Sequence, residues 1–241
     1  MDRSTDVFFW PAMDIVLWGF TTLYISQQAT GLSFIVTSVL AGLILWMAVW
    51  RGQYEITVNL LEEMWNQNMI NIFASPIRVR EWIAGVFLLG VIKMFFTLSF
   101  ATLVAIVVYK ARIFSLGFYL LPFLALLLMT GWAFGIIVAG VIIRFGTKIQ
   151  TLAWSGVSLV TPFSGVFYPV SVLPDWAQKI SAVLPTSYIF EGMRSVLLKG
   201  TLPLDYLFMS LLINVILLSF GLFFFAYMFN QSKKQGLSRL E

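Results

Sequence analysis

The residue types that carry most enzymatic and metal chemistry are missing from this chain. Its 241 residues include no histidine and no cysteine. Ser-His-Asp triads, HExxH zinc sites, disulfides and thiolate metal sites are therefore impossible. Neither GxxxxGK[ST] nor GxGxxG occurs, so we do not expect the chain to bind or hydrolyse a nucleotide. We expect no cofactor in this chain, and any energy must come from another subunit or from an ion gradient.

The remaining groups that could do chemistry are single polar side chains inside hydrophobic stretches. We interpret Asp14 and Lys93 as structural charges that pair with each other or reach toward the interface, and substrate contact is the alternative. Thr151, Ser155 and Ser158 recur at helical spacing and form a small hydroxylated face. Such a face either lines a translocation path or packs against a neighbouring helix.

The composition places these residues in a membrane. The chain is 60% hydrophobic and only 11% charged, whereas a soluble domain carries about 25% charged residues. Too few charges are present to cover a surface that faces water. The fifteen lysines and arginines lie mainly between the hydrophobic runs, as membrane topology requires, so we expect no nucleic acid partner.

The hydrophobic runs predict an all-α integral membrane protein with one transmembrane domain over residues 1–241. About 20 apolar residues are needed to cross the bilayer. We predict six transmembrane helices, near residues 8–26, 32–50, 82–109, 118–143, 149–169 and 203–229. With both termini in the cytoplasm, inside segments hold nine lysines and arginines and outside segments five, with Lys93 left out. This bias predicts cytoplasmic termini.

A polar segment between the second and third predicted spans has the pattern of an amphipathic helix over residues 53–74. Its apolar positions recur at steps of three and four, and they are Tyr54, Val58, Leu61, Trp65, Met69 and Ile72. The opposite face carries Glu55, Asn59, Glu62, Glu63 and Asn66. A helix that lies on anionic lipid usually carries Lys and Arg on its polar face. The acidic face therefore favours a protein partner, with the membrane surface as the alternative.

A second segment, residues 173–199, is too interrupted to cross a membrane. Pro174 and Pro185 break it, and we predict two short helices, the second of which ends at Gly200. Apolar faces with charged tips favour a re-entrant or interfacial hairpin on the outer side. Glu191 and Arg194 are three residues apart and can pair. This pair is either a surface ion pair of little energetic consequence or a functional one.

These segments resemble the type-2 ABC exporter permeases. The resemblance is carried by Phe167–Trp176, by Leu184–Tyr188 and by Glu191–Arg194, which are similar to the signature stretch of that family. The stretch Ala74–Arg78 is similar to the region of those permeases that contacts the ATP-binding cassette. The opening Trp10–Asp14 also resembles that of the family, and the predicted layout of spans agrees.

The resemblance implies the membrane subunit of an ATP-binding-cassette exporter in the inner or plasma membrane. Its implied partners are a separate ATPase subunit, which holds ATP and Mg, a second copy of this chain or a homologous permease, and membrane lipid. Residues 53–74 would dock on the ATPase. The implied docking residues are Tyr54, Glu62, Glu63, Trp65, Met69 and, just after this range, Arg78. Residues 173–199 would form the outer gate, with Pro174, Trp176, Pro185, Tyr188, Glu191 and Arg194.

We therefore predict outward transport of an amphiphilic substrate by alternating access. A drug, a lipid or a lipid-linked glycan fits, because so apolar a path offers few sites for a small polar solute. The alternative is an ion-coupled secondary transporter or channel, which needs intramembrane acids along its path, and only Asp14 is available. A membrane-bound enzyme is disfavoured further by the lack of histidine and cysteine.

Overall fold

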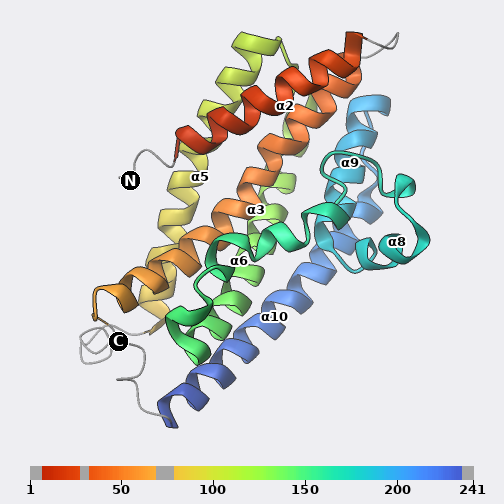
Figure 1. The fold of residues 1–241 in the computed structure, drawn as a ribbon. Helices are drawn as coiled ribbons and strands as arrows, with labels where there is room; N and C mark the ends of the chain where they lie inside the picture. The colour runs from red at the N-terminus through yellow and green to blue at the C-terminus, as the bar shows by residue number, and fades with distance from the viewer. Residues whose placement is uncertain (1–6, 28–32, 69–78, 235–241) are drawn as a thin grey trace. The chain divides into compact units, whose positions relative to one another are not determined.

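The computed structural model describes residues 7–27, 33–68 and 79–234, and every regular element in these ranges is helical (Figure 1). The longer helices are α2 (Phe9–Gln27), α3 (Ser33–Trp65), α5 (Val79–Tyr109), α6 (Leu120–Phe145), α9 (Pro185–Lys199) and α10 (Leu204–Lys234). The shorter ones are η1 (Ile113–Tyr119), η2 (Gly146–Ile149), α7 (Leu152–Ser155), η3 (Val157–Leu159), η4 (Thr161–Phe163), η5 (Val170–Val172) and α8 (Asp175–Ser181). The predicted all-α class is confirmed for the described residues.

The chain divides into two compact units, and α3, α5, α6 and α10 each contribute a segment to both. The first unit contains residues 1–48, 93–127 and 161–213, and the second contains residues 49–92, 128–160 and 214–241. In the first unit, the Tyr109 hydroxyl of α5 donates a hydrogen bond to the Val16 carbonyl oxygen of α2, at 3.0 Å. This bond ties α2 to the C-terminal end of α5.

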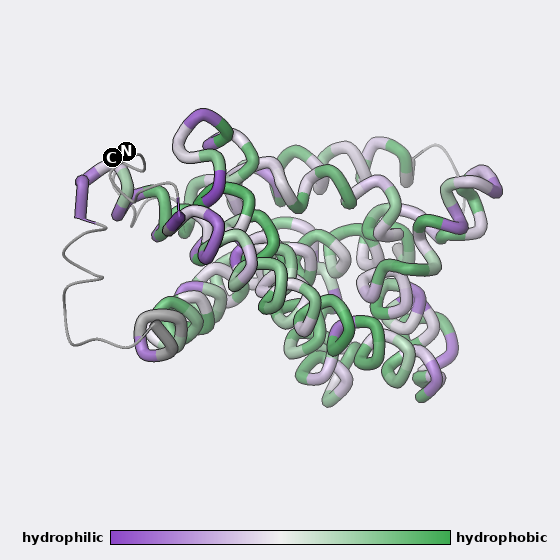
Figure 2. Tube along the Cα trace, turned by 90° about the horizontal axis from the view of Figure 1, so that it is seen from below, coloured by the Kyte–Doolittle hydropathy of each residue, from purple (hydrophilic) through white to green (hydrophobic). Residues whose placement is uncertain are grey.

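Four helical stretches are long and apolar enough to cross a membrane. They are Phe34–Trp65, Ala84–Tyr109, Ile113–Ile149 and Leu204–Ser232, and they correspond to four of the six predicted spans. Figure 2 shows hydrophobic residues along the long helices. The helix α2 begins and ends within a residue of the predicted first span. This helix, which contains Pro11 and Asp14, is not among the four stretches.

The structure differs from the prediction at α3. The sequence predicts a span over residues 32–50 and a separate helix over 53–74, but α3 runs without interruption from Ser33 to Trp65. A helix of 33 residues is about 50 Å long, whereas the hydrocarbon core is about 30 Å thick. One helix therefore replaces the predicted span and the first half of the predicted amphipathic helix. Residues 69–74 lie outside the described residues.

Close packing explains why Gly52 does not interrupt α3. A Cβ on Gly52 would lie 3.1 Å from the Gly131 Cα of α6, and a Cβ on Gly131 would lie 2.4 Å from the Val49 carbonyl oxygen. The two glycines thus allow the backbones of α3 and α6 to touch, as small residues do between membrane helices. The contact belongs to the second unit.

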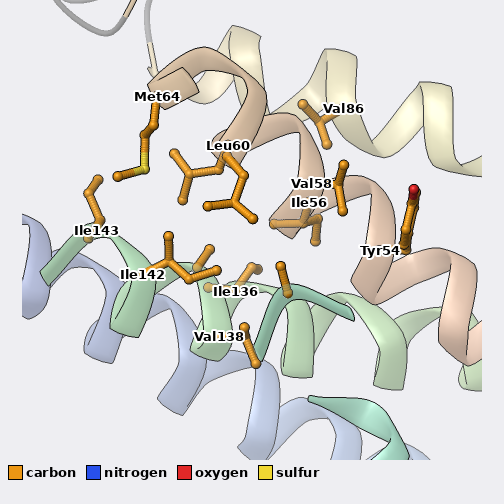
Figure 3. Close-up of a cluster of buried hydrophobic side chains, with 13 residues drawn as sticks. Tyr54, Ile56, Val58, Leu60, Met64, Val86, Ile136, Val138, Ile142 and Ile143 are labelled. Carbon is orange, nitrogen blue, oxygen red and sulfur yellow. The ribbon is translucent and has the colours of Figure 1, made fainter. Parts of the chain in front are cut away.

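The core of the second unit is built on this contact between α3 and α6. Its side chains come from α3, α5, α6 and α7 and include Leu61, Met64, Val86, Ile142 and Ala153. Figure 3 shows side chains of α3 facing those of α6. Leu61 and Ala153 are completely buried, so the C-terminal half of α3 is fixed by apolar packing.

The second difference concerns the predicted helical span at residues 149–169. This stretch is not one helix but a series of short helical turns, α7, η3 and η4, followed by irregular chain to Pro169. Two of its residues weaken a helix, because Pro162 lacks a backbone N–H and Gly165 has a φ of +70°.

Candidate functional site

The end of α3 carries the predicted docking residues. Trp65 is 46% exposed, and its ring stacks on that of Trp154 of α7 with the centroids 6.1 Å apart. Glu62 and Glu63 are half-buried, and the Asn68 side-chain amide donates to Glu63 Oε2 at 2.7 Å. This end of α3 therefore presents two acids and an aromatic ring.

Three other predicted docking positions differ or are not described. Tyr54 is only 9% exposed and belongs to the core of the second unit. It is buried because α3 is covered on several sides at this level. Met69 and Arg78 lie outside the described residues. The accessible part of the predicted docking surface is thus Glu62, Glu63 and Trp65.

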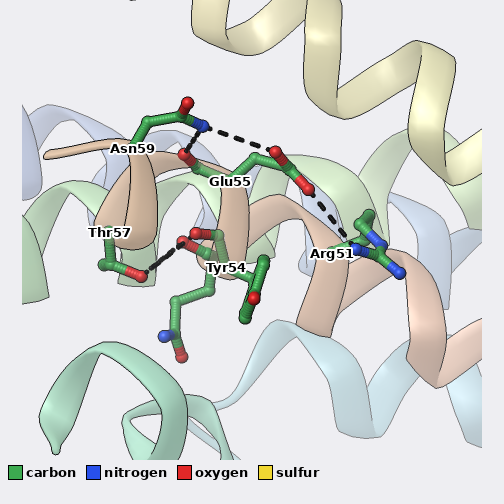
Figure 4. Close-up of polar contacts among 6 residues, drawn as sticks. Arg51, Tyr54, Glu55, Thr57 and Asn59 are labelled. Carbon is green, nitrogen blue, oxygen red and sulfur yellow. Dashed lines mark hydrogen bonds and ion pairs between the residues drawn. The ribbon is translucent and has the colours of Figure 1, made fainter. Parts of the chain in front are cut away.

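The acidic face predicted for this helix is partly buried. Glu55 is 1% exposed and forms an ion pair with Arg51, also 1% exposed, at 3.3 Å (Figure 4). The Asn59 side-chain amide donates to Glu55 Oε2 at 3.4 Å. The Arg51 guanidinium lies 5.1 Å from the centroid of the Trp50 ring and 5.7 Å from that of Tyr54. The i,i+4 spacing of Arg51 and Glu55 is the sequence signal that predicts such a pair.

Two further polar residues of α3, Gln53 and Thr57, bind the interrupted segment. Gln53 is 1% exposed, and its Nε2 donates to the Ala153 carbonyl oxygen at 2.7 Å. Gln53 Oε1 accepts a hydrogen bond from the Val157 backbone N–H. Thr57 Oγ1 also donates to the Ala153 carbonyl oxygen, at 2.9 Å. Sequence reasoning missed both residues, because their partners lie about a hundred positions further along the chain.

In the first unit, Glu191 connects the predicted outer hairpin to Val170, which precedes that hairpin in the chain. Its Oε1 accepts hydrogen bonds from the Val170 backbone N–H at 2.7 Å and from Arg194 Nη2 at 3.0 Å. The Arg194 side chain is 8% exposed and that of Glu191 is 28% exposed. The pair is therefore more sheltered than a surface ion pair, and it ties η5 to α9.

A cavity of about 280 Å³ opens beside Glu191. Its polar lining comes from Gln178, Ser181, Ser187, Tyr188, Glu191 and Tyr206. The hydroxyls of Ser181 and Ser187 both donate to the Phe163 carbonyl oxygen, at 2.6 and 3.1 Å. The Tyr188 hydroxyl donates to the Ala182 carbonyl oxygen at 2.9 Å. These bonds hold the turn between α8 and α9 against η4.

Of the remaining predicted gate residues, the two prolines lie at the starts of α8 and α9, and Trp176 lies within α8. Pro174 directly precedes α8, and Pro185 is the first residue of α9. Trp176 is 61% exposed, and its ring makes an edge contact with that of Phe163 at 5.9 Å. As predicted, Gly200 ends α9 in the left-handed conformation. The six predicted gate residues all belong to the first unit.

The predicted pathway or packing residues are dispersed. Asp14 is exposed on α2, and Lys93 is half-buried in α5. Thr151 and Ser158 are exposed, whereas the Ser155 hydroxyl donates to the Thr151 carbonyl oxygen at 2.9 Å. That bond stays inside the interrupted segment, so Ser155 stabilises its own turn.

Comparison with known proteins identifies the family. No curated protein sequence matches the chain. The model of the ABC-2 type transporter family matches residues 2–198, which is most of the chain. This membrane domain is the permease part of such a transporter and contains no ATPase domain. The chain therefore belongs to the ABC-2 type transporter family and is a membrane permease subunit.

Proposed function

We propose that this permease exports an amphiphilic substrate by alternating access, driven by ATP hydrolysis on a separate subunit. The observation that carries the proposal is the match to the ABC-2 membrane domain over residues 2–198. ABC-2 permeases generally pair with ATPase subunits. The long apolar helices favour a drug, a lipid or a lipid-linked glycan over a small polar solute. The working unit is a pair of permeases in the inner or plasma membrane.

The ATPase docks on the end of α3, where Glu62, Glu63 and Trp65 are accessible. The continuity of α3 supports this role, because the docked end and the predicted second span belong to one uninterrupted helix. The proposed docking surface is acidic. A basic groove on the ATPase therefore fits it better than anionic lipid does.

The hairpin of α8 and α9 gates the outer end of the path and re-enters the membrane. The link from Glu191 to Val170 and Arg194 supports this proposal, because one carboxylate joins α9 to η5, the turn that precedes α8. The neighbouring cavity leaves room for these helices to shift.

The docking proposal is tested by reversing the charge of the α3 end with the double variant Glu62→Lys and Glu63→Lys. We expect this variant to insert normally, to lose the co-purifying ATPase subunit and to stop transporting. Against anionic lipid the same lysines would strengthen association, by about 1 kcal/mol each. Trp65→Ala should weaken ATPase binding by about 2 kcal/mol or more if the ring is an interface anchor.

The matched control is the double variant Asp175→Lys and Asp205→Lys, which makes the same change of charge at two exposed acids of the first unit. It should retain the ATPase. If the α3 variant also retained a stoichiometric ATPase subunit, α3 would not be the docking element, and the membrane-surface alternative would stand.

A further inference from the structure

The hydrogen bonds of the interrupted segment show where its helix stops. Successive α-helical bonds join the Ser155 N–H to the Thr151 oxygen at 3.1 Å and the Gly156 N–H to the Leu152 oxygen at 2.9 Å. The next bond of this series would join the Val157 N–H to the Ala153 oxygen. Beyond that point the spacing changes, since the Val160 N–H bonds to the Val157 oxygen, three residues back.

Gln53 binds both the Val157 N–H and the Ala153 carbonyl oxygen, the two groups that the next helical bond would join. Its Nε2 donates to the Ala153 oxygen at 2.7 Å, and its Oε1 accepts from the Val157 N–H. The carboxamide thus occupies the place of one helical hydrogen bond, as an inserted side chain does at a helix kink. Gln53 is buried, and these two bonds engage its carbonyl oxygen and one N–H of its amide.

The backbone around this point is already close to helical. Gln150, Thr151, Gly156 and Val160 all have φ and ψ in the right-handed helical region, for example −53° and −51° at Gly156. Closing the bond between Ala153 and Val157 therefore requires small dihedral changes over a few residues. Pro162 limits how far the helix can continue, because it offers no N–H.

We infer that Gln53 is a positioning residue that holds residues 152–161 in a bent form, and that its withdrawal lets them close into a continuous helix. Gln53 thereby connects α3 to a segment that the sequence predicts to lie in the membrane. Gln53 and Trp65 are on the same helix, twelve residues or about 18 Å apart. Resting on the proposed function, a shift of the docked end of α3 would displace Gln53 and switch this segment.

The test is hydrogen exchange of the backbone amides of residues 157–161 in the purified permease, measured by mass spectrometry. Gln53→Leu conserves bulk and removes both hydrogen bonds. If the segment then closes into a helix, its amides take α-helical backbone partners, and we expect them to exchange several-fold more slowly than in the wild type. A purely structural role for Gln53 predicts the opposite sign, because loss of buried bonds would loosen the segment and speed exchange. Unchanged or faster exchange would therefore overturn the inference.

Two further variants separate the bonds involved. Thr57→Val removes the second donor to the Ala153 oxygen but leaves both Gln53 bonds, so exchange should stay within about twofold of the wild type. Adding Val157→Pro to Gln53→Leu removes the N–H that the helix needs, and the segment should return to fast exchange. If hydrogen exchange remains slow in the double variant, the slow exchange does not come from a helical bond at Val157, and the proposed role of Gln53 is wrong. If Gln53→Leu does not fold, Gln53→Asn replaces it. The asparagine side chain is too short to reach both groups, so the same slower exchange is expected.

The link to transport needs the partner. In the complex with its ATPase, trapping the ATP-bound state should slow exchange at residues 157–161 of the wild type and leave Gln53→Leu unchanged. No response in the wild type would overturn the switching step. The experiment on the permease alone does not depend on the ATPase, so failure of the proposed docking and failure of the role of Gln53 are distinguishable.

Discussion

At the scale of single residues, the ion pair of Arg51 and Glu55 shows how two charges are accommodated in an apolar core. Both side chains are 1% exposed. The guanidinium also lies near the rings of Trp50 and Tyr54, an arrangement in which aromatic faces attract a cation. Asn59 supplies an additional donor to Glu55. Each charge thus contacts groups that the same helix presents within two turns.

Replacing one member of this pair should lower the stability of the protein more than replacing both. Arg51→Met removes the cation that pairs with the buried Glu55 carboxylate, and we expect a loss of about 3–5 kcal/mol of stability. The double variant Arg51→Met with Glu55→Leu leaves no charge behind and should be close to the wild type in stability. Thermal unfolding of the purified protein in detergent measures the difference. A single variant as stable as the wild type would show that the pair is not isolated from water.

At the scale of elements, the hairpin of α8 and α9 is fixed by polar contacts around Phe163 and Glu191. Two serine hydroxyls converge on one carbonyl oxygen, and one carboxylate joins a backbone N–H to an arginine. Such a cluster is strong when complete and is weakened by the loss of a single member.

Glu191→Gln tests whether this cluster takes part in gating. The amide oxygen of the glutamine can still accept a hydrogen bond from the Val170 N–H, but the charge attraction between residue 191 and Arg194 is lost. We expect transport to fall while the amount of protein in the membrane is unchanged, and Arg194→Gln should behave alike. Lys179→Gln, an exposed neutralisation on α8, is the control and should transport normally. Wild-type transport in both Glu191 and Arg194 variants would leave the pair with a structural role only.

At the scale of the whole molecule, orientation is tested by labelling introduced cysteines with membrane-impermeant reagents. The chain has no native cysteine, so each signal reports one site. Gln28→Cys and Lys179→Cys should react from outside the cell, and Gln67→Cys only after the membrane is opened. This pattern follows from the excess of lysine and arginine in the predicted inside segments. Labelling of position 67 from outside would reverse the orientation and contradict the docking proposal.

The sequence alone determined the class of the protein, because class depends on composition and on local patterns. Too few charges for a soluble surface, long apolar runs and the missing phosphate-binding motif are all readable without a fold. The end of α9 at Gly200 was predictable for the same reason, because glycine readily adopts the left-handed conformation that ends a helix.

Only the tertiary structure decided how the polar residues of α3 are used. Periodicity assigned Glu55 to a polar face, but packing on several sides of α3 buries it with Arg51. Likewise, hydropathy predicted a continuous helix over residues 149–169. In the structure, Gln53 of α3 bonds the Ala153 carbonyl oxygen and the Val157 N–H, which would bond each other in that helix. A hydropathy pattern averages over neighbours in the chain. A hydrogen bond depends on which backbone groups folding brings within 3 Å of a side chain, and that is settled only when the helices pack.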